Sequence, residues 1–254
     1  FALPISLAQR QHMAGQRISV HALSPQGAQH NAVLTGSNTH TIPAAPVTGN
    51  IHGVTRDGEW NYFVEGWACS LGVDAPIDVH VYAGGPADGG GALIASARAD
   101  GVSGTDVASA CQAHGSAYSF KVHLTESVRN AHSNRGIHVH AISPVGGPHL
   151  TIGNSGAFPV PPLLRTADFI SFTPSPGRID NGEHSQLTAH LRNTGNVVWR
   201  GDSYLAWGSG SFTHSEALPH SVYPGQDVAV RWHVAPLNRG SGITRVMYMA
   251  SMAQ

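Results

Sequence analysis

Charged side chains are scarce in this sequence of 254 residues: they make up 11% of it, against about 25% in an average soluble domain. Lysine and arginine together number 14 and aspartate and glutamate 15, so the net charge is close to zero; Lys121 is the only lysine. Nucleic-acid-binding surfaces and polybasic membrane anchors need an excess of positive charge. The composition therefore argues against both.

Long apolar runs and the common catalytic motifs are also missing. No hydrophobic stretch reaches the roughly 18 residues that a transmembrane helix needs. The GxSxG, HExxH and CxxC patterns do not occur, and the glycine-rich run Gly84–Gly91 lacks the Lys-Ser/Thr ending of a phosphate loop. We therefore expect no membrane span, no cofactor and no enzymatic activity in these residues.

Cysteine occurs twice, at Cys69 and Cys111. Two cysteines in a chain of this composition could be buried thiols, but we favour a disulfide, since the surrounding sequence has the character of a secreted protein. A disulfide forms in an oxidising compartment, so we expect a secreted, extracellular or cell-surface location.

An internal repeat organises the first two thirds of the chain. Residues 1–25 align without a gap to residues 120–144, at a constant offset of 119 residues. A match of this kind at a fixed period predicts a tandem repeat. The identical pairs are Phe1/Phe120, Arg10/Arg129, Ile18/Ile137, Val20/Val139, His21/His140, Ala22/Ala141, Ser24/Ser143 and Pro25/Pro144.

The repeat sets the expected domain boundaries. The second copy, residues 49–161, has a front half that the first copy, residues 1–46, lacks, so we expect the first to be the rear half of a truncated repeat in a longer protein. Its missing strands would then come from other parts of the same polypeptide or from another chain. A proline-rich stretch, Pro159–Leu164, predicts a linker before a third domain at residues 165–254.

The expected fold class is all-β: tandem β-sandwich domains with one or two short helices, the last domain immunoglobulin-like. Alternating apolar residues bounded by turn signals define the expected strands. Small polar residues suited to an N-cap mark where the short helices are expected to begin. In the complete copy we expect strands at 59–69, 76–83, 93–97, 118–124, 136–142 and 149–152, and helical turns at 103–112 and 125–134. In the third domain we expect strands at 169–172, 186–192, 197–199, 203–207, 227–234 and 243–250. A seven-stranded sandwich needs one more strand, so we expect this domain to lack its last strand.

Two resemblances bear on function. Residues 50–161 resemble a module of secreted multidomain proteins of proteobacteria, through Gly66-Trp67-Ala68-Cys69, Val79-His80-Val81-Tyr82-Ala83-Gly84-Gly85-Pro86, Val107-Ala108-Ser109-Ala110-Cys111, Ile137-His138-Val139-His140 and Gly153-Asn154-Ser155-Gly156. Residues 165–254 resemble immunoglobulin-like domains with an Asn193-Thr194-Gly195 and Trp199 signature, followed by Tyr223-Pro224-Gly225-Gln226. The resemblances imply non-catalytic modules that bind or act as spacers beside other domains.

Histidine is abundant, and His138 and His140 share one strand face. With His80 they could form a zinc site, since three histidines can hold catalytic zinc. The repeat argues against this, because Ser19 stands in the first copy where the second has His138. We expect structural histidines, and keep a metal site at His138, His140 and His80 as the lesser alternative.

Aromatic residues give the best candidates for a binding site. On the expected strand 59–69, Phe63, Trp67 and Cys69 share a face that we assign to the core, which leaves Trp60 and Tyr62 partly exposed. Flat aromatic surfaces on β-sandwiches stack against sugars, and nearby carboxylates accept hydrogen bonds from hydroxyl groups. The candidate ligand-binding residues are Trp60, Tyr62, Asp57, Glu59, Tyr204 and Trp207.

The sequence therefore predicts a non-catalytic extracellular binding or spacer region of a larger secreted bacterial protein. Carbohydrate or cell-surface glycan is the expected ligand class. The alternative is a set of accessory stalk modules of a secreted hydrolase whose catalytic domain lies outside these residues.

Overall fold

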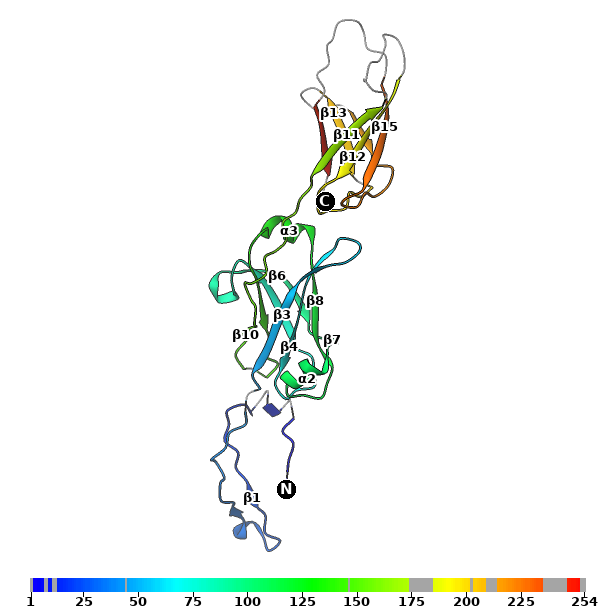
Figure 1. Cartoon of the computed structure of the whole chain (residues 1–254). Helices are drawn as coiled ribbons and strands as arrows, with labels where there is room; N and C mark the ends of the chain where they lie inside the picture. Colours follow the sequence, from blue (N-terminus) through cyan, green and yellow to red (C-terminus); the bar gives the residue numbers. More distant parts are fainter. Residues whose placement is uncertain are drawn as a thin grey trace. The chain divides into compact units, whose positions relative to one another are not determined.

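The computed structural model describes residues 2–6, 9–10, 13–43, 45–145, 147–173, 185–201, 203–208, 214–234 and 246–251. The fold is all-β, as the sequence predicts, with two short α-helices among the named elements (Figure 1). The chain divides into two compact units: Phe1–Arg56 with Asn61–Pro162, and Asp57–Trp60 with Leu163–Gln254. None of the helices in the described ranges is long and apolar enough to cross a membrane.

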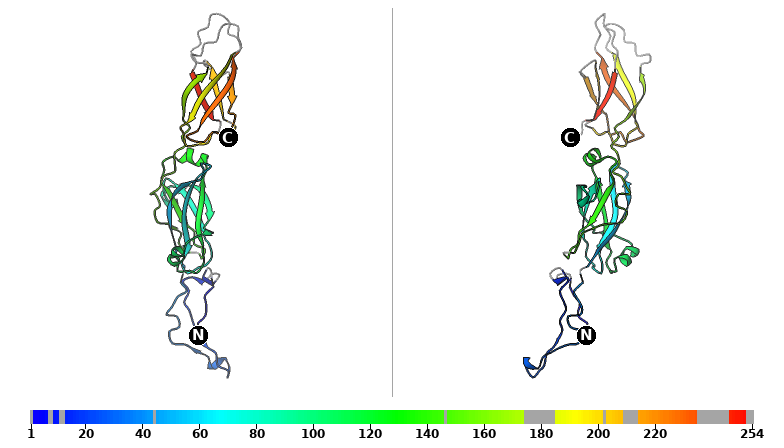
Figure 2. Two further views of the ribbon diagram at one scale, coloured as in Figure 1. Left: turned by 45° about the vertical axis from the view of Figure 1, so that its right-hand side comes forward. Right: turned by 90° about the vertical axis from the view of Figure 1, so that its left-hand side faces the viewer.

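The first unit contains a sandwich of two four-stranded sheets. Their strand orders are β3-β4-β8-β7 and β10-β9-β5-β6, and all the pairings within them are antiparallel. The two sheets lie face to face in both views of Figure 2. The strands are β3 (Val47–Arg56), β4 (Tyr62–Ser70), β5 (Asp78–Ala83), β6 (Ala92–Arg98), β7 (Gly101–Val102), β8 (Ala117–Leu124), β9 (Ile137–Ala141) and β10 (Leu150–Thr151).

The core of this sandwich is built by the alternation of each strand. Val64 and Ala68 of β4 meet Val79 and Val81 of β5 and Val139 of β9, and none of these side chains is exposed. Burying apolar surface of this kind is the main favourable contribution to folding. The Thr125 side chain begins α3 (Glu126–His132) by accepting a hydrogen bond from the Val128 main chain at 3.2 Å.

The prediction for the two faces of β4 is right in part: Cys69 is buried, Trp67 packs against a core and Tyr62 is partly exposed, but the main core lies on the Tyr62 side. The strand begins at Tyr62, and Tyr62 packs against the main core together with Val64 and Ala68, whereas Phe63 and Trp67 point to the opposite face. Part of β4 has no room for a larger side chain. At Gly66 a Cβ would be 2.4 Å from the carbonyl oxygen of Asn50 on β3, the neighbouring strand of the same sheet.

A second, smaller core lies on the other face of β4. Cys69 and Cys111 form the predicted disulfide, and both are completely buried with Tyr118 and Val107. Cys111 caps α2 (Thr105–Ala110), so the bond fastens this helix to the sheet. Trp67 packs against the same cluster.

Residues 13–43 form an irregular hairpin. It contains β1 (His21–Ala22), which pairs with β2 (Ala32–Val33), and an isolated bridge between Arg17 and Thr41. A 3₁₀ turn, η1 (Ala28–His30), connects the two strands. Several apolar side chains of this hairpin are exposed, Leu23 and Val33 among them.

The second unit has two three-stranded antiparallel sheets, ordered β11-β12-β15 and β14-β13-β16. Trp199 is buried, and the buried Asn193 side chain donates hydrogen bonds to the Val197 and Val222 carbonyls at 2.8 and 2.9 Å. The strands are β11 (Ala167–Thr173), β12 (Ser185–Asn193), β13 (Ser203–Gly208), β14 (His214–Ala217), β15 (Asp227–Val234) and β16 (Val246–Ser251).

Candidate functional site

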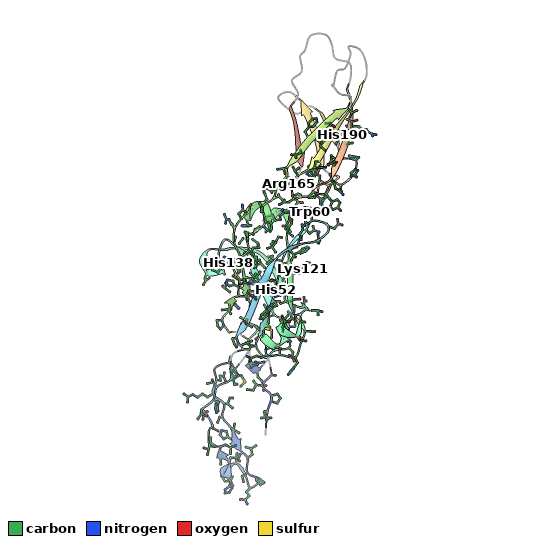
Figure 3. All side chains as sticks on the ribbon, in the orientation of Figure 1. His52, Trp60, Lys121, His138, Arg165 and His190 are labelled. Atoms are coloured by element: carbon green, nitrogen blue, oxygen red, sulfur yellow. A yellow bond between two sulfur atoms is a disulfide. The ribbon has the colours of Figure 1, made fainter. Side chains whose placement is uncertain are left out.

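The first unit carries an open groove of about 610 Å³ along β3, the edge strand of its sheet. Apolar and aromatic side chains form most of its walls, with a histidine and a threonine as polar groups. Figure 3 labels His52, which lies on β3. The lining residues are His52, Gly53, Val54, Thr55, Tyr62, Phe158, Pro159 and Pro161.

Three segments that are distant in sequence build this groove. β3 supplies residues 52–55, where a register shift between Ile51 and Gly53 interrupts the regular pairing with β4. β4 supplies Tyr62 at its first position. The third wall is the segment 158–161, which main-chain hydrogen bonds join to residues 135–137 at the start of β9. The groove therefore forms only when the first two strands of the sandwich and the segment that follows its last strand have folded together.

Arg129 of α3 holds two of these walls in place. Its side chain is 2% exposed, and its guanidinium carbon lies 4.1 Å from the centre of the Tyr62 ring. The same group donates hydrogen bonds to the carbonyls of Pro161 at 3.4 Å and Pro162 at 2.8 Å. A buried arginine satisfies its charge through such contacts, and the stacking on an aromatic ring is typical of a guanidinium.

The only lysine does not contribute to this groove. Lys121 bonds Glu65 at 2.8 Å and lies 4.5 Å above the Phe63 ring, on the β4 face opposite to Tyr62. The hydrogen bond from Lys121 lowers the pKa of the Glu65 carboxyl group. The pair is neutral overall, so this part of the surface offers no net positive charge to an anionic ligand.

The predicted ligand-binding residues are only partly brought together. Tyr62 lines the groove, but Asp57, Glu59 and Trp60 belong to the turn between β3 and β4, outside its lining. In this turn the Asp57 carboxylate accepts a hydrogen bond from the Glu59 main chain at 2.9 Å. Trp60 has a left-handed φ of 62° and precedes β4, so it does not share the strand face that the alternation assigned to it.

Two further candidates lie in the second unit. Tyr204 and Trp207 occupy β13, but their side chains lie outside the described part of the chain. Sequence analysis missed Phe158 and His52. Phe158 directly precedes the proline-rich stretch that was interpreted as a linker, and an aromatic residue beside prolines was the only available signal for it.

The histidines cluster on the outer face of the other sheet. His80 pairs directly with His140 across β5 and β9, and Tyr82 pairs with His138. The Tyr82 and His140 rings are 5.0 Å apart. Within the residues that the structure describes, no group of three or more His, Cys, Asp or Glu side chains is arranged to hold a metal ion.

His140 is occupied by hydrogen bonds instead. Its Nε2 accepts from the Ala87 main chain at 3.2 Å and lies 3.0 Å from the Thr151 hydroxyl. The same nitrogen is thus engaged by two neighbours and is not directed at an ion. Burial lowers the pKa of His140; Asp88 opposes this shift, and His138, His149 and His80 add to it.

No family model matches the chain, and no curated protein matches it. The geometry of the groove is therefore the basis for assigning a function.

Proposed function

We propose that the chain is a non-catalytic, extracellular binding region of a secreted bacterial protein, and that the groove along β3 binds a neutral glycan. The observation that carries the proposal is the composition of the groove: two aromatic rings, two prolines and a few polar groups line an open hollow of about 610 Å³. Ligand sites commonly combine apolar walls with a small number of polar groups that orient the ligand.

The arrangement of the aromatic rings fits a sugar. Arg129 covers one face of the Tyr62 ring, which leaves the rest of the ring to the groove, and Phe158 adds a second apolar wall. The CH faces of a pyranose pack against such surfaces, while His52 and Thr55 can exchange hydrogen bonds with its hydroxyl groups. Each such polar contact contributes about 1 kcal/mol net, so a single module should bind weakly.

The charge and the disulfide agree with this assignment. With a net charge of −1 the chain offers little attraction to anionic polymers, which favours an uncharged ligand. The buried Cys69–Cys111 disulfide is compatible with an oxidising environment outside the cytoplasm.

A polysaccharide pull-down with the full chain tests the proposal. We expect neutral bacterial or plant polysaccharides to retain the wild type, and Tyr62→Ala to weaken retention by tenfold or more. Tyr62 also packs on the core, so His52→Ala provides a second variant at an exposed position; its unfolding should match the wild type while its binding falls. Phe63→Ala, on the opposite face of β4, is the matched control and should bind as the wild type does.

Two outcomes would contradict the proposal. Equal binding by the wild type, Tyr62→Ala and His52→Ala would show that the groove is not the binding site. Loss of binding in Trp60→Ala alone would place the site in the turn between β3 and β4. If the chain retains no polysaccharide at all, the stalk role beside a secreted hydrolase becomes the better assignment.

A further inference from the structure

The hairpin of residues 15–42 repeats the hydrogen bonding of residues 134–160. Five main-chain hydrogen bonds have a counterpart 118 or 119 residues later, with distances that agree within 0.1 Å. Near the base of the hairpin, the bond from Gly15 N to Ile42 O corresponds to that from Asn134 N to Val160 O, and the bond from Ile42 N to Gln16 O corresponds to that from Val160 N to Arg135 O. Further along, Ile18 N to His40 O corresponds to Ile137 N to Phe158 O, and Asn38 N to Ile18 O corresponds to Gly156 N to Ile137 O. Finally, Leu34 N to Val20 O corresponds to Ile152 N to Val139 O.

Side chains and backbone angles follow the same correspondence. The Ser37 hydroxyl accepts a hydrogen bond from the Val20 main chain at 3.0 Å, as the Ser155 hydroxyl accepts one from Val139 at 3.2 Å. Asn38 adopts a left-handed φ of 64°, and its counterpart Gly156 one of 84°. The hairpin thus has the conformation of the rear half of the sandwich in its details.

The surroundings of the two segments differ. In the sandwich, Val139 and Ile137 are fully buried and Ile152 is 3% exposed. In the hairpin the counterpart of Ile152, Leu34, is 38% exposed, and Ala22 is exposed although its counterpart Ala141 is not. Ile18 and Val20 are partly exposed, so the hairpin leaves open to solvent, in whole or in part, the apolar face that its counterpart buries.

One edge of the hairpin is also open. In β9 the main chains of His138 and His140 pair with Tyr82 and His80 of β5. Their counterparts are Ser19 and His21. His21 stands opposite Val33 in β2, but it is the main chains of Ile18 and Val20 that bond across the hairpin, so the N–H and C=O groups of Ser19 and His21 point to the other side of the strand. On that side β1 has no neighbouring strand among the described residues. An unpaired strand edge beside exposed apolar residues is a template for another strand.

We propose that residues 18–22 and Leu34 form a docking surface for the front half of a sandwich of the same kind. A strand like β5 pairs antiparallel with Ser19 and His21, and the apolar residues of that half cover Ile18, Val20 and Leu34. The established contact between β5 and β9 supplies the template for this partner. Edge-to-edge pairing of two copies of the hairpin would satisfy the main chain but leave Leu34 and Val20 uncovered, so we infer a half-sandwich and not a second copy.

A duplication tests this inference, because Phe1 aligns with Phe120. A second copy of residues 47–119 is fused directly ahead of Phe1 of the full chain, and amide hydrogen exchange is followed by NMR. We expect exchange at Ser19 and His21 to slow by about 100-fold or more relative to the unextended chain. The matched control carries Val79→Asp and Val81→Asp in the added copy only and should leave both amides in fast exchange.

A second measurement guards against misfolding of the extension. The unextended chain is titrated with a synthetic peptide of residues 76–83, and with the same peptide carrying both aspartates. We expect amide shifts at Ser19 and His21 with the first peptide alone. The proposal is overturned if the fusion does not slow exchange at Ser19 and His21 and the peptide does not shift their amide signals. It is also overturned if the unextended chain has the mass of a dimer and already shows slow exchange at these amides, because two copies of the hairpin would then cover each other.

Discussion

His140 is a buried ring whose hydrogen bonding requires the neutral form. The Ala87 N–H donates to Nε2, so the ring proton resides on Nδ1, and a second proton would place two donors against each other. Because burial lowers the folded pKa below the unfolded value of about 6.5, the unfolded chain takes up the proton first as the pH falls. The stabilisation from His140 is therefore complete above pH 6.5 and is lost as the pH falls through the folded pKa.

We expect His140→Gln to reduce this pH dependence, since glutamine keeps an acceptor but does not titrate. Urea unfolding at pH 7.5 and 5.5 should show a larger drop in stability for the wild type than for the variant. His30→Gln, at an exposed position, is the control and should follow the wild type. The same drop in all three proteins would show that His140 is not the group responsible.

Gly66 is a residue whose lack of a side chain permits two strands and a ring to meet. A Cβ at this position would lie 2.4 Å from the Asn50 carbonyl oxygen and 2.7 Å from Cζ of Phe120. We expect Gly66→Ala to lower the free energy of unfolding by about 1–3 kcal/mol, the usual effect of overpacking. Gly58→Ala, where nothing lies within 4 Å of the added carbon, should change it by less than about 0.5 kcal/mol. A thermal denaturation series that ranks the two variants equally would contradict this account.

At the scale of elements, the disulfide stabilises α2 against β4. It closes a loop with a sequence separation of 42 residues, which corresponds to about 4 kcal/mol in the chain-entropy model. We expect Cys69→Ala with Cys111→Ala to lose a large part of this stability, measured by urea unfolding under oxidising conditions. Thiol labelling of the unfolded, unreduced wild type should find no free cysteine. Two labelled thiols would exclude the bond in solution.

The sequence predicted elements well where alternation and length agreed. β5, β8, β9 and β15 lie within two residues of their expected bounds, because in each of them large aliphatic or aromatic residues recur at every second position. β3 was missed, since Gly49, Asn50 and Gly53 dilute its alternation. The face of β4 was predicted correctly only in part: Cys69 and Trp67 do belong to a core, but to the smaller one, while Val64 and Ala68 on the other face form the main core.

The candidate site was harder to predict than the strands. Tyr62 could be named from the sequence, but its groove partners come from residues 52–55 and 158–161, about 100 residues apart. Such pairings depend on register and on the path of the chain across the sandwich, which local patterns do not encode. Arg129 gave a sequence signal only through its match with Arg10, and that match carried no information about Tyr62.

At the scale of the whole molecule, histidine governs how the charge responds to pH. The formal charge is −1 with neutral histidines, and protonating all 17 would raise it to +16 while the carboxylates stay ionised. We expect weak retention on a cation exchanger at pH 7.5 and strong retention at pH 5.5, together with lower solubility near the neutral pI. Elution at the same salt concentration at both pH values would show that most of these histidines stay neutral.

Arg129 fixes the walls of the groove, and this bears on the kinetics and the entropy of binding there. Since one buried guanidinium contacts Tyr62 and bonds the carbonyls of Pro161 and Pro162, the walls are preorganised before any ligand arrives. Under the proposed function, a ligand would meet walls that are already in place, and binding would cost little free energy for ordering the protein. Weak affinity in this groove would therefore be expressed as fast dissociation from a site whose shape is the same when it is empty and when it is full.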